Sequence, residues 1–333
     1  MQEQQKWIAR WHEQGALSAQ QIPAALRLAG VPPSGQEWRA WIDRLLLWLG
    51  VAALLAGLIF FVAANWSGMG RFGKFALAEA AIIASLVAYA LSARFRYGNA
   101  ALLAASLAVG ALLALIGQTY QTGADTFELF AVWALLILPW VLMARLPALW
   151  VLWLAILNVA YVFYVQTFGA RWGLFLHDEK MFVGIALFDS CALIVWEWFA
   201  ARGREWMRGR WVPRLLALTA GGVATVLAIY FIVNYRYTNG WYFVLYIAVI
   251  VGMYGGYRYW VPDLFMLAGG ALSVIVVATT GLGRILFENN TRELISAFLL
   301  LGLFSMLTTA GAAWWLRQVA YELKGKPPTK KQR

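Results

Sequence analysis

The chain has 333 residues, of which 62% are hydrophobic and only 13% are charged. A soluble domain carries about 45–50% apolar and about 25% charged residues, so this composition excludes a single water-soluble domain and makes lipid the solvent for much of the surface. The net charge of +11 and the 19 Trp are typical of basic cytoplasmic ends and interfacial indole rings. The one cysteine, Cys191, lies in an apolar segment, which excludes a disulfide framework and a thiolate metal cluster within the chain.

The first 43 residues are predicted to form a small cytosolic module of three helices. Trp7, Ile8 and Trp11 share one helical face, since they are spaced at i, i+3 and i+4. Residues 18–21 match a capping box at the start of a second short helix. A third helix, opened by a further capping box, is expected to lead toward the membrane.

Ten segments of membrane length follow the module. They lie near 45–64, 75–92, 100–117, 129–144, 148–168, 181–199, 215–234, 241–257, 264–281 and 294–316. Each is close to the ~20 residues that span the hydrocarbon core of a bilayer. The predicted fold is therefore an all-α polytopic membrane protein, with a module at 1–43, a transmembrane domain at 44–317 and a basic cytosolic tail at 318–333.

The basic residues are distributed unevenly between the two sides of this topology. Of the 27 Lys and Arg, 20 lie in the terminal regions and the even-numbered connections. The other connections hold the remaining seven, Arg71, Lys74, Arg171, Lys180, Arg236, Arg284 and Arg292. The positive-inside rule then places both termini in the cytoplasm, and the basic excess predicts no binding of nucleic acid. The Arg-rich connection at 202–214 and the Lys-rich tail are expected to face anionic lipid headgroups.

Small residues recur every four positions along the second and third predicted spans. They are Ala76, Ala80, Ala84, Ala88 and Ser92 on the second span, and Ala100, Ala104 and Ala108 on the third. Such ladders let helix backbones approach closely in lipid. They predict the faces by which these two spans pack.

Two carboxylates lie in the interior of predicted spans, away from the span ends. Asp189 is near the middle of its span, and Glu79 is nearer the outer side. A charged Asp at the bilayer centre costs about 2.5–3.5 kcal/mol on insertion scales, and no Lys or Arg lies in a span core. Asp189 is therefore expected to be neutral or to face a hydrated cavity. One interpretation is a proton or ion relay through Asp189 and Glu79, with Asn158 or Asn234; the other is a neutral carboxyl hydrogen-bonded to a neighbouring helix.

Most signatures of catalytic and cofactor sites are absent from the sequence. It contains no phosphate-binding loop, no nucleophile elbow and no zinc-binding HExxH helix. His12 and His177 fall on opposite predicted faces of the membrane, so they cannot share a metal within one subunit. Glu197 lies near the cytoplasmic end of its span, where Arg202 is close enough to neutralise it. We therefore predict no catalytic residue, no metal and no cofactor.

A polar hairpin between the third and fourth spans is the main candidate contact site. It faces outward in this topology and carries Gln118, Tyr120, Gln121, Asp125 and Glu128. Asp125 and Glu128 have the spacing of a capping box at the start of the fourth span. Tyr120 is also compatible with an ordinary interfacial anchor. The two Gln either line a shallow outward cavity or contact a partner, since polar groups at membrane depth are kept when satisfied or lining a cavity.

Three stretches resemble a known family. They are GALSAQQI, WLGVAALLAGLIFFVAANW and GALLALIGQTYQTGADTFELFAVWALLILPW. Residues 7 to about 145 are similar to bacterial predicted membrane proteins grouped as domain of unknown function 2157. The resemblance implies a multi-pass protein of the bacterial cytoplasmic (inner) membrane and no particular reaction. It also implies a second, small membrane-anchored protein as a partner.

Three functions are compatible with these observations. The first is a non-enzymatic component of a membrane or envelope complex, which contacts its partner through the hairpin at 117–128 and the N-terminal module. The second is a proton-coupled transporter of a small solute that uses Asp189 and Glu79. The third is a membrane enzyme acting on lipid-linked substrates, with Asp125, Glu128 and the outer loops as its site.

Overall fold

The protein is described by a computed structural model. It describes residues 2–18, 21, 22, 25, 35, 38, 39, 41–43, 45, 46, 49, 60, 64, 66–91, 98–120, 123–168, 178–234, 240–289 and 294–325. The chain divides into two compact units, Met1–Lys74 and Phe75–Arg333. Each unit is treated by itself.

In the first unit, helix α1 covers Gln2–Glu13 and ends near Gly15, which has a left-handed φ of +72°. Ile8 on the predicted apolar face is buried. The predicted capping box at 18–21 is partly formed, since the Ser18 backbone N–H donates to Gln21 Oε1 at 3.0 Å. Most of the rest of the predicted module and most of the span at 45–64 lie outside the described residues.

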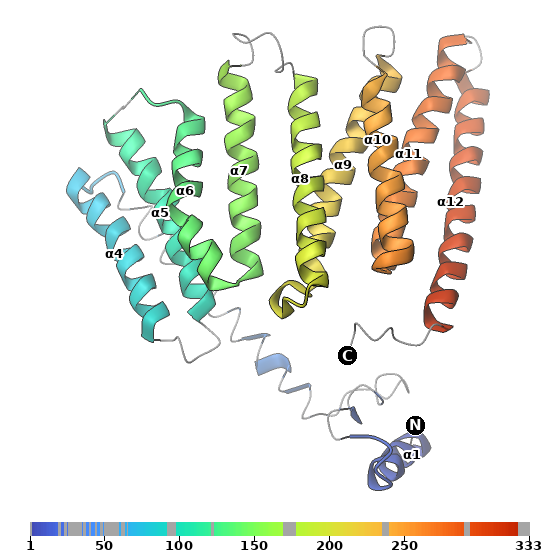
Figure 1. Ribbon diagram of the computed structural model, residues 1–333, viewed down its shortest axis with the longest axis horizontal. Coiled ribbons are helices and arrows are strands. Elements are labelled where there is room, and N and C mark those ends of the chain that lie inside the picture. Colours follow the sequence, from blue (N-terminus) through green and yellow to red (C-terminus); the bar gives the residue numbers. More distant parts are fainter. Residues whose placement is uncertain are drawn as a thin grey trace. The chain divides into compact units, whose positions relative to one another are not determined.

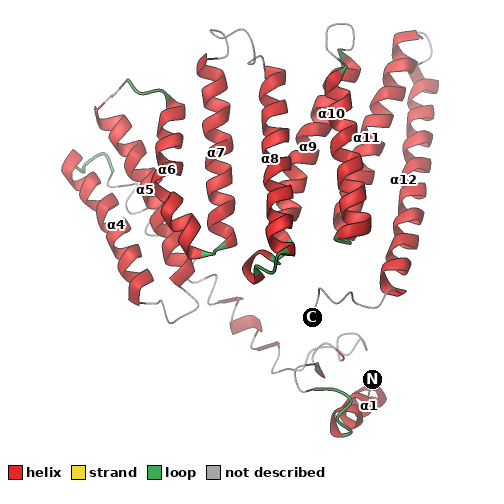
Figure 2. Ribbon diagram, viewed as in Figure 1, coloured by secondary structure: helices red, strands yellow, loops and turns green. Residues whose placement is uncertain are grey.

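The described part of the second unit is helical, and its long helices lie side by side (Figures 1 and 2). They are α4 (Arg71–Leu91, which begins before the unit boundary), α5 (Gly98–Tyr120), α6 (Thr126–Ala144), α7 (Pro147–Phe168), α8 (Asp178–Ala201), α9 (Trp211–Val233), α10 (Trp241–Gly255), α11 (Leu264–Asn289) and α12 (Leu294–Gly325). Two short elements join some of them: the 3-10 helix η1 (Glu205–Met207) and the π-helical turn η2 (Gly256–Trp260). An all-α polytopic membrane fold is thereby confirmed.

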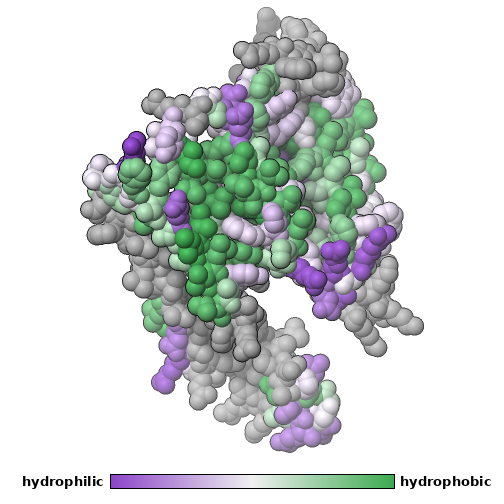
Figure 3. Space-filling view, turned by 60° about the vertical axis from the view of Figure 1, so that its left-hand side comes forward, coloured by the Kyte–Doolittle hydropathy of each residue, from purple (hydrophilic) through white to green (hydrophobic). Residues whose placement is uncertain are grey.

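Eight of the described helices are long and apolar enough to cross a membrane. Helix α10 has only 15 residues before its geometry changes to the π-helical turn, so the helix that forms the predicted span at 241–257 is shorter than the other long helices. The predicted count of ten is therefore approximate. Around the middle of the helices the described surface is largely apolar, with hydrophilic residues nearer their ends (Figure 3), as expected for helices in lipid.

The structure contains the predicted turn between α6 and α7, but the last helix continues beyond the predicted end of its span. Arg145 adopts a left-handed conformation, with φ of 49°, at the end of α6, which confirms the predicted break between the spans at 129–144 and 148–168. Helix α12 continues to Gly325, well beyond the predicted end at 316 and into the predicted tail. Val319 is buried and Glu322 pairs with Arg258, so tertiary contacts extend this helix.

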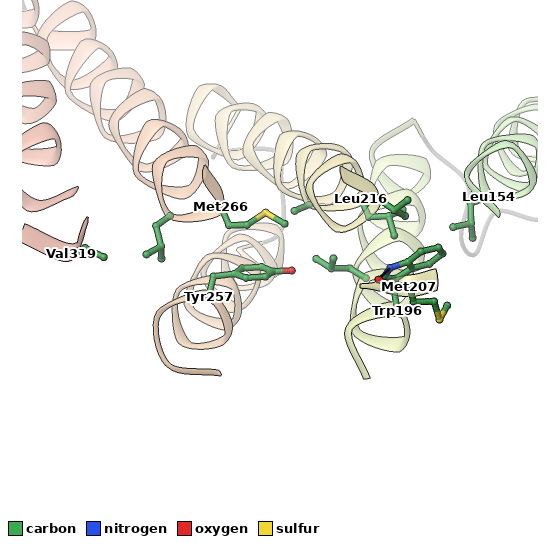
Figure 4. Close-up of a cluster of buried hydrophobic side chains, with 11 residues drawn as sticks. Leu154, Trp196, Met207, Leu216, Tyr257, Met266 and Val319 are labelled. Atoms are coloured by element: carbon green, nitrogen blue, oxygen red, sulfur yellow. Dashed lines mark hydrogen bonds between the residues drawn. The ribbon is translucent and has the colours of Figure 1, made fainter. Parts of the chain in front are cut away.

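The cluster of buried side chains drawn in Figure 4 lies at one end of the helices and joins α7, α8, η1, α9, η2, α11 and α12. Its buried members include Leu154, Trp196, Leu216, Tyr257 and Val319. The indole N–H of Trp196 donates to the carbonyl of Met207 in η1 at 3.1 Å. A connecting loop is thus held against the helices by apolar burial and a satisfied polar group.

Among the described residues, the small-residue ladders predicted in the sequence are not the faces by which α4 and α5 pack. On α5 the buried residues include Leu102, Ala105 and Ser106, so the contact face is rotated away from the predicted ladder. Trp133 of α6 explains the rotation, because it donates to the Ser106 carbonyl at 2.8 Å and its ring covers Gly110. On α4 no described residue is buried, and the described members of its predicted ladder are exposed.

Candidate functional site

The polar hairpin lies between α5 and α6, with most of its candidate side chains on the surface. Gln118 is exposed in the last turn of α5, and Tyr120 is 58% exposed beside the Phe75 ring of α4. Gln121 lies outside the described residues. Gly123 has a φ of +66°, which a residue with a side chain rarely adopts. The described residues form a surface turn, and no polar cavity is seen among them.

Asp125 and Glu128 mark the start of α6, as predicted, but without the expected capping hydrogen bond. Asp125 occupies the N-cap position in an extended conformation, and its side chain makes no cap hydrogen bond. The backbone N–H of Glu128 donates to the Asp125 carbonyl at 3.0 Å. Both carboxylates are exposed, so water solvates them, and their contribution at this helix end is electrostatic.

Asp189 is buried in α8, with an exposed fraction of 2%. The Asn158 Nδ2 of α7 donates to Asp189 Oδ1 at 2.9 Å and to the Leu154 carbonyl at 3.1 Å. A backbone carbonyl can only accept a hydrogen bond, so the atom of Asn158 that faces Leu154 must be the amide nitrogen. The same nitrogen faces Asp189 Oδ1, which therefore accepts a hydrogen bond from it. The second predicted candidate, Asn234, instead ends α9 and donates to the Tyr230 carbonyl.

Glu79 lies apart from this pair. It is exposed on α4, a helix that touches the core through residues such as Leu86 and Tyr89 nearer its other end. Helices α5, α6 and α7 lie between α4 and α8 (Figure 1). Among the described residues, the structure therefore does not bring Glu79, Asp189 and Gln118 together in one cavity.

The structure assembles a charged cluster that the sequence does not predict. At the end of the helices that the charge count assigns to the cytoplasm, Arg210 Nη1 contacts Glu197 Oε1 at 2.9 Å and Arg210 Nε contacts Asp263 Oδ2 at 3.1 Å. Arg214 Nε and Nη2 each donate to Asp263 at 3.1 Å. The Tyr257 hydroxyl donates to Glu197 Oε1 at 3.1 Å. We call these five residues the ion network.

The ion network corrects the predicted partner of Glu197. The sequence predicts that Arg202 neutralises it, but the Arg202 guanidinium lies 3.5 Å from the centre of the Trp198 ring. Arg210, which is 13 positions from Glu197, takes that role because η1 folds the chain back. The available signal is the density of Arg in the connection at 202–214, but no sequence rule gives which of them turns inward.

Electrostatics within the network are strongly coupled. Burial raises the pKa of the Asp263 carboxyl, but hydrogen bonds from Arg214 and Arg210 outweigh burial, so the pKa is below its ordinary value. Burial lowers the pKa of Arg210, while the charges and hydrogen bonds of Glu197 and Asp263 raise it above the usual value. Asp263 and Arg210 are therefore both ionised at neutral pH, and the network links α8, α9, η2 and the start of α11.

The chemistry open to these sites is limited. No group of three or more His, Cys, Asp or Glu is placed to hold a metal ion among the residues that the structure describes. Each acid of the ion network already accepts hydrogen bonds from an arginine. Glu79 lies in the interior of a span and makes no hydrogen bond or ion pair to another described residue. Its carboxylate is therefore available to a hydrogen-bond donor from a partner.

Comparison with known proteins bears on the N-terminal part of the chain. No curated protein and no solved structure matches the chain significantly. A family model does match, over residues 9–150, the region that includes the polar hairpin. That part of the chain is thereby shown to resemble the family described as Predicted membrane protein (DUF2157).

Proposed function

We propose that the protein is a non-enzymatic subunit of a membrane complex, and that α4 with the polar hairpin contacts another membrane protein. The observation that carries the proposal is Glu79, an exposed carboxylate on a helix with no buried described residue. The exposed Gln118 and Tyr120 lie at the neighbouring end of α5, where Tyr120 meets Phe75 of α4.

The position of Glu79 on α4 is energetically unfavourable unless another group contacts it. Glu79 lies two turns into the helix that begins at Arg71, or about 12 Å along its axis. An acidic side chain facing hydrocarbon at this depth is costly, and such groups almost always face protein or a water-filled cavity. The small residues Ala76, Ala80 and Ala84 are exposed on the same helix and allow a close helix approach. A partner helix that offers a hydroxyl or amide to Glu79 satisfies both features.

A photoreactive amino acid at position 79 tests the proposal directly. After irradiation in cells and purification in mild detergent, we expect a product larger than the protein alone, with peptides from a second membrane protein. The matched control places the photoreactive group at Ile194 of α8, which is 68% exposed, and there we expect lipid adducts. A crosslink from position 79 that reaches only residues 45–64 of the same chain would contradict the proposal.

A substitution separates partner contact from lipid contact. Glu79→Leu makes α4 more compatible with lipid, so a helix that faces lipid keeps its behaviour or gains stability. If Glu79 binds a partner, the variant loses the co-purified protein although it folds normally. Ile83→Leu, one turn further along α4 at a position that is 61% exposed, is the control and should retain the partner.

A further inference from the structure

A groove between α10, α11 and α12 lies apart from the sites described above. It has a volume of about 460 Å³, within the ~300–1,000 Å³ typical of ligand pockets. Helix α11 packs against both α10 and α12 and supplies the small residues Gly270, Ala271 and Ala278 to the lining. Gly311 and Ala312 of α12 face the same space, so short side chains on two helices leave the groove open.

The lining of the groove selects an apolar occupant. Apart from Tyr254 and Trp315 at one end, Thr308 is the polar side chain in it. The Thr308 hydroxyl lies 2.8 Å from the Phe304 carbonyl of its own helix, to which it donates. Water in such a space would find too few hydrogen-bond partners to be held. The lining residues of α11 and α12 belong to helices long and apolar enough to cross a membrane. The apolar group that surrounds such helices is the acyl chain of a lipid.

The end of the groove nearest the ion network carries groups suited to a lipid headgroup. The Tyr254 and Trp315 rings lie 6.1 Å apart there. One turn beyond Tyr254, Arg258 pairs with Glu322 of α12. The Glu322 side chain is 56% exposed, whereas that of Arg258 is 15% exposed, so the cation is held in place and its anionic partner is open to exchange. Tyr259 beside it is exposed, as is common at a membrane interface.

We infer that this groove binds one acyl chain of an anionic phospholipid, with the lipid phosphate at Arg258. The phosphate replaces or joins Glu322 as the partner of Arg258, since a guanidinium suits both a carboxylate and a phosphate. The acyl chain fills the space that α10 and α12 leave between them. The site is independent of the α4 surface, so either proposal can fail without the other.

Two glycines allow the groove to be filled without disturbing the protein. A Cβ added at Gly270 or at Gly311 meets no atom within 4 Å, so Gly270→Leu and Gly311→Leu place the new side chain in the space meant for the lipid. Gly302 of α12 is equally open and is not part of the lining. Gly302→Leu is therefore the matched control.

The experiment uses the full-length protein in mild detergent, with phosphatidylglycerol as the anionic probe and phosphatidylcholine as the zwitterionic one. Native mass spectrometry counts the lipids bound to each variant. We expect the wild type and Gly302→Leu to retain one phosphatidylglycerol in preference to phosphatidylcholine. The two groove variants should bind it about tenfold more weakly or worse, because the displaced methylenes lose their contacts. Arg258→Gln should bind both lipids equally.

Each alternative outcome counts against the inference. If Gly311→Leu and Gly270→Leu elute as folded protein and retain the same phosphatidylglycerol as Gly302→Leu, the groove is not the lipid site. If Arg258→Gln keeps the preference for phosphatidylglycerol, the headgroup assignment is wrong. A photoreactive acyl chain that labels all exposed helices equally, without enrichment on α10, α11 or α12, would show annular lipid only.

Discussion

Asp263→Asn is the sharpest test of the ion network. The Asp263 side chain is 3% exposed and accepts from Arg210 Nε, from two Arg214 nitrogens and from the Phe265 backbone N–H. The substitution removes the negative charge and places an amide N–H₂ group opposite guanidinium donors. Removing one partner of a buried ion pair costs about 3–5 kcal/mol. The side chains of Arg210 and Arg214 are 30% and 42% exposed, so water offsets part of this, and we expect about 2–3 kcal/mol.

The assay is unfolding in detergent, followed by the fluorescence of the 19 Trp. Trp196 and Trp206 pack in the neighbouring cluster, so part of the signal comes from this end of the helices. Asp125→Asn is the control, because Asp125 is exposed and makes no side-chain cap hydrogen bond; it should change the free energy of unfolding by less than about 0.5 kcal/mol. An Asp263→Asn variant as stable as Asp125→Asn would refute the view that the network holds α8, α9 and α11 together.

Three further predictions concern the pH dependence of Asp263 and two contacts between other helices. Folding lowers the pKa of Asp263, so the Asp263 carboxylate stabilises the protein at neutral pH. This stabilisation is lost as the pH falls through the folded pKa. The unfolding temperatures of wild type and Asp263→Asn should therefore converge as the pH falls below about 4. Gly110→Ala would drive a methyl group into the Trp133 ring and should lower the free energy of unfolding by about 1–3 kcal/mol, whereas Gly117→Ala on the same helix, with nothing within 4 Å, should not. Asn158→Leu removes the interhelical donor to Asp189 and should lower the free energy of unfolding by about 0.6–1.7 kcal/mol. Asp189→Asn keeps an acceptor for Asn158, so its free energy of unfolding in detergent should be nearly unchanged. A large loss of proton flux in a normally folded Asp189→Asn variant would instead favour transport.

Sequence patterns identified the membrane helices well because lipid imposes a strong and local constraint. Each span must be about 20 apolar residues long and satisfy its own backbone, so hydropathy alone predicted α5 to α9 closely. Hydropathy did not predict that α10 is short and passes into a π-helical turn. It also did not predict the length of α12, which tertiary contacts of Val319 and Glu322 extend.

The side-chain sites were less predictable because their partners are distant in sequence. Asn158 and Asp189 are both recognisable as polar groups in spans, yet only their packing on α7 and α8 pairs them. The acids of the hairpin lie at the start of α6 as predicted, without the predicted capping bond. The Ala ladder of α5 predicted a packing face that the Trp133 ring and its hydrogen bond to Ser106 shift to another side.

By itself, the sequence determined that the protein lies in lipid, that it is helical and where most of its turns fall. These properties depend on residues close together in the chain. Tertiary structure decided which charges meet. Arg210 and Arg214 are two of several arginines in one connection, and Asp263 is about 50 positions away. Their pairing depends on η1 and η2 folding three helix ends together, and long-range geometry of this kind leaves no periodic trace in the sequence.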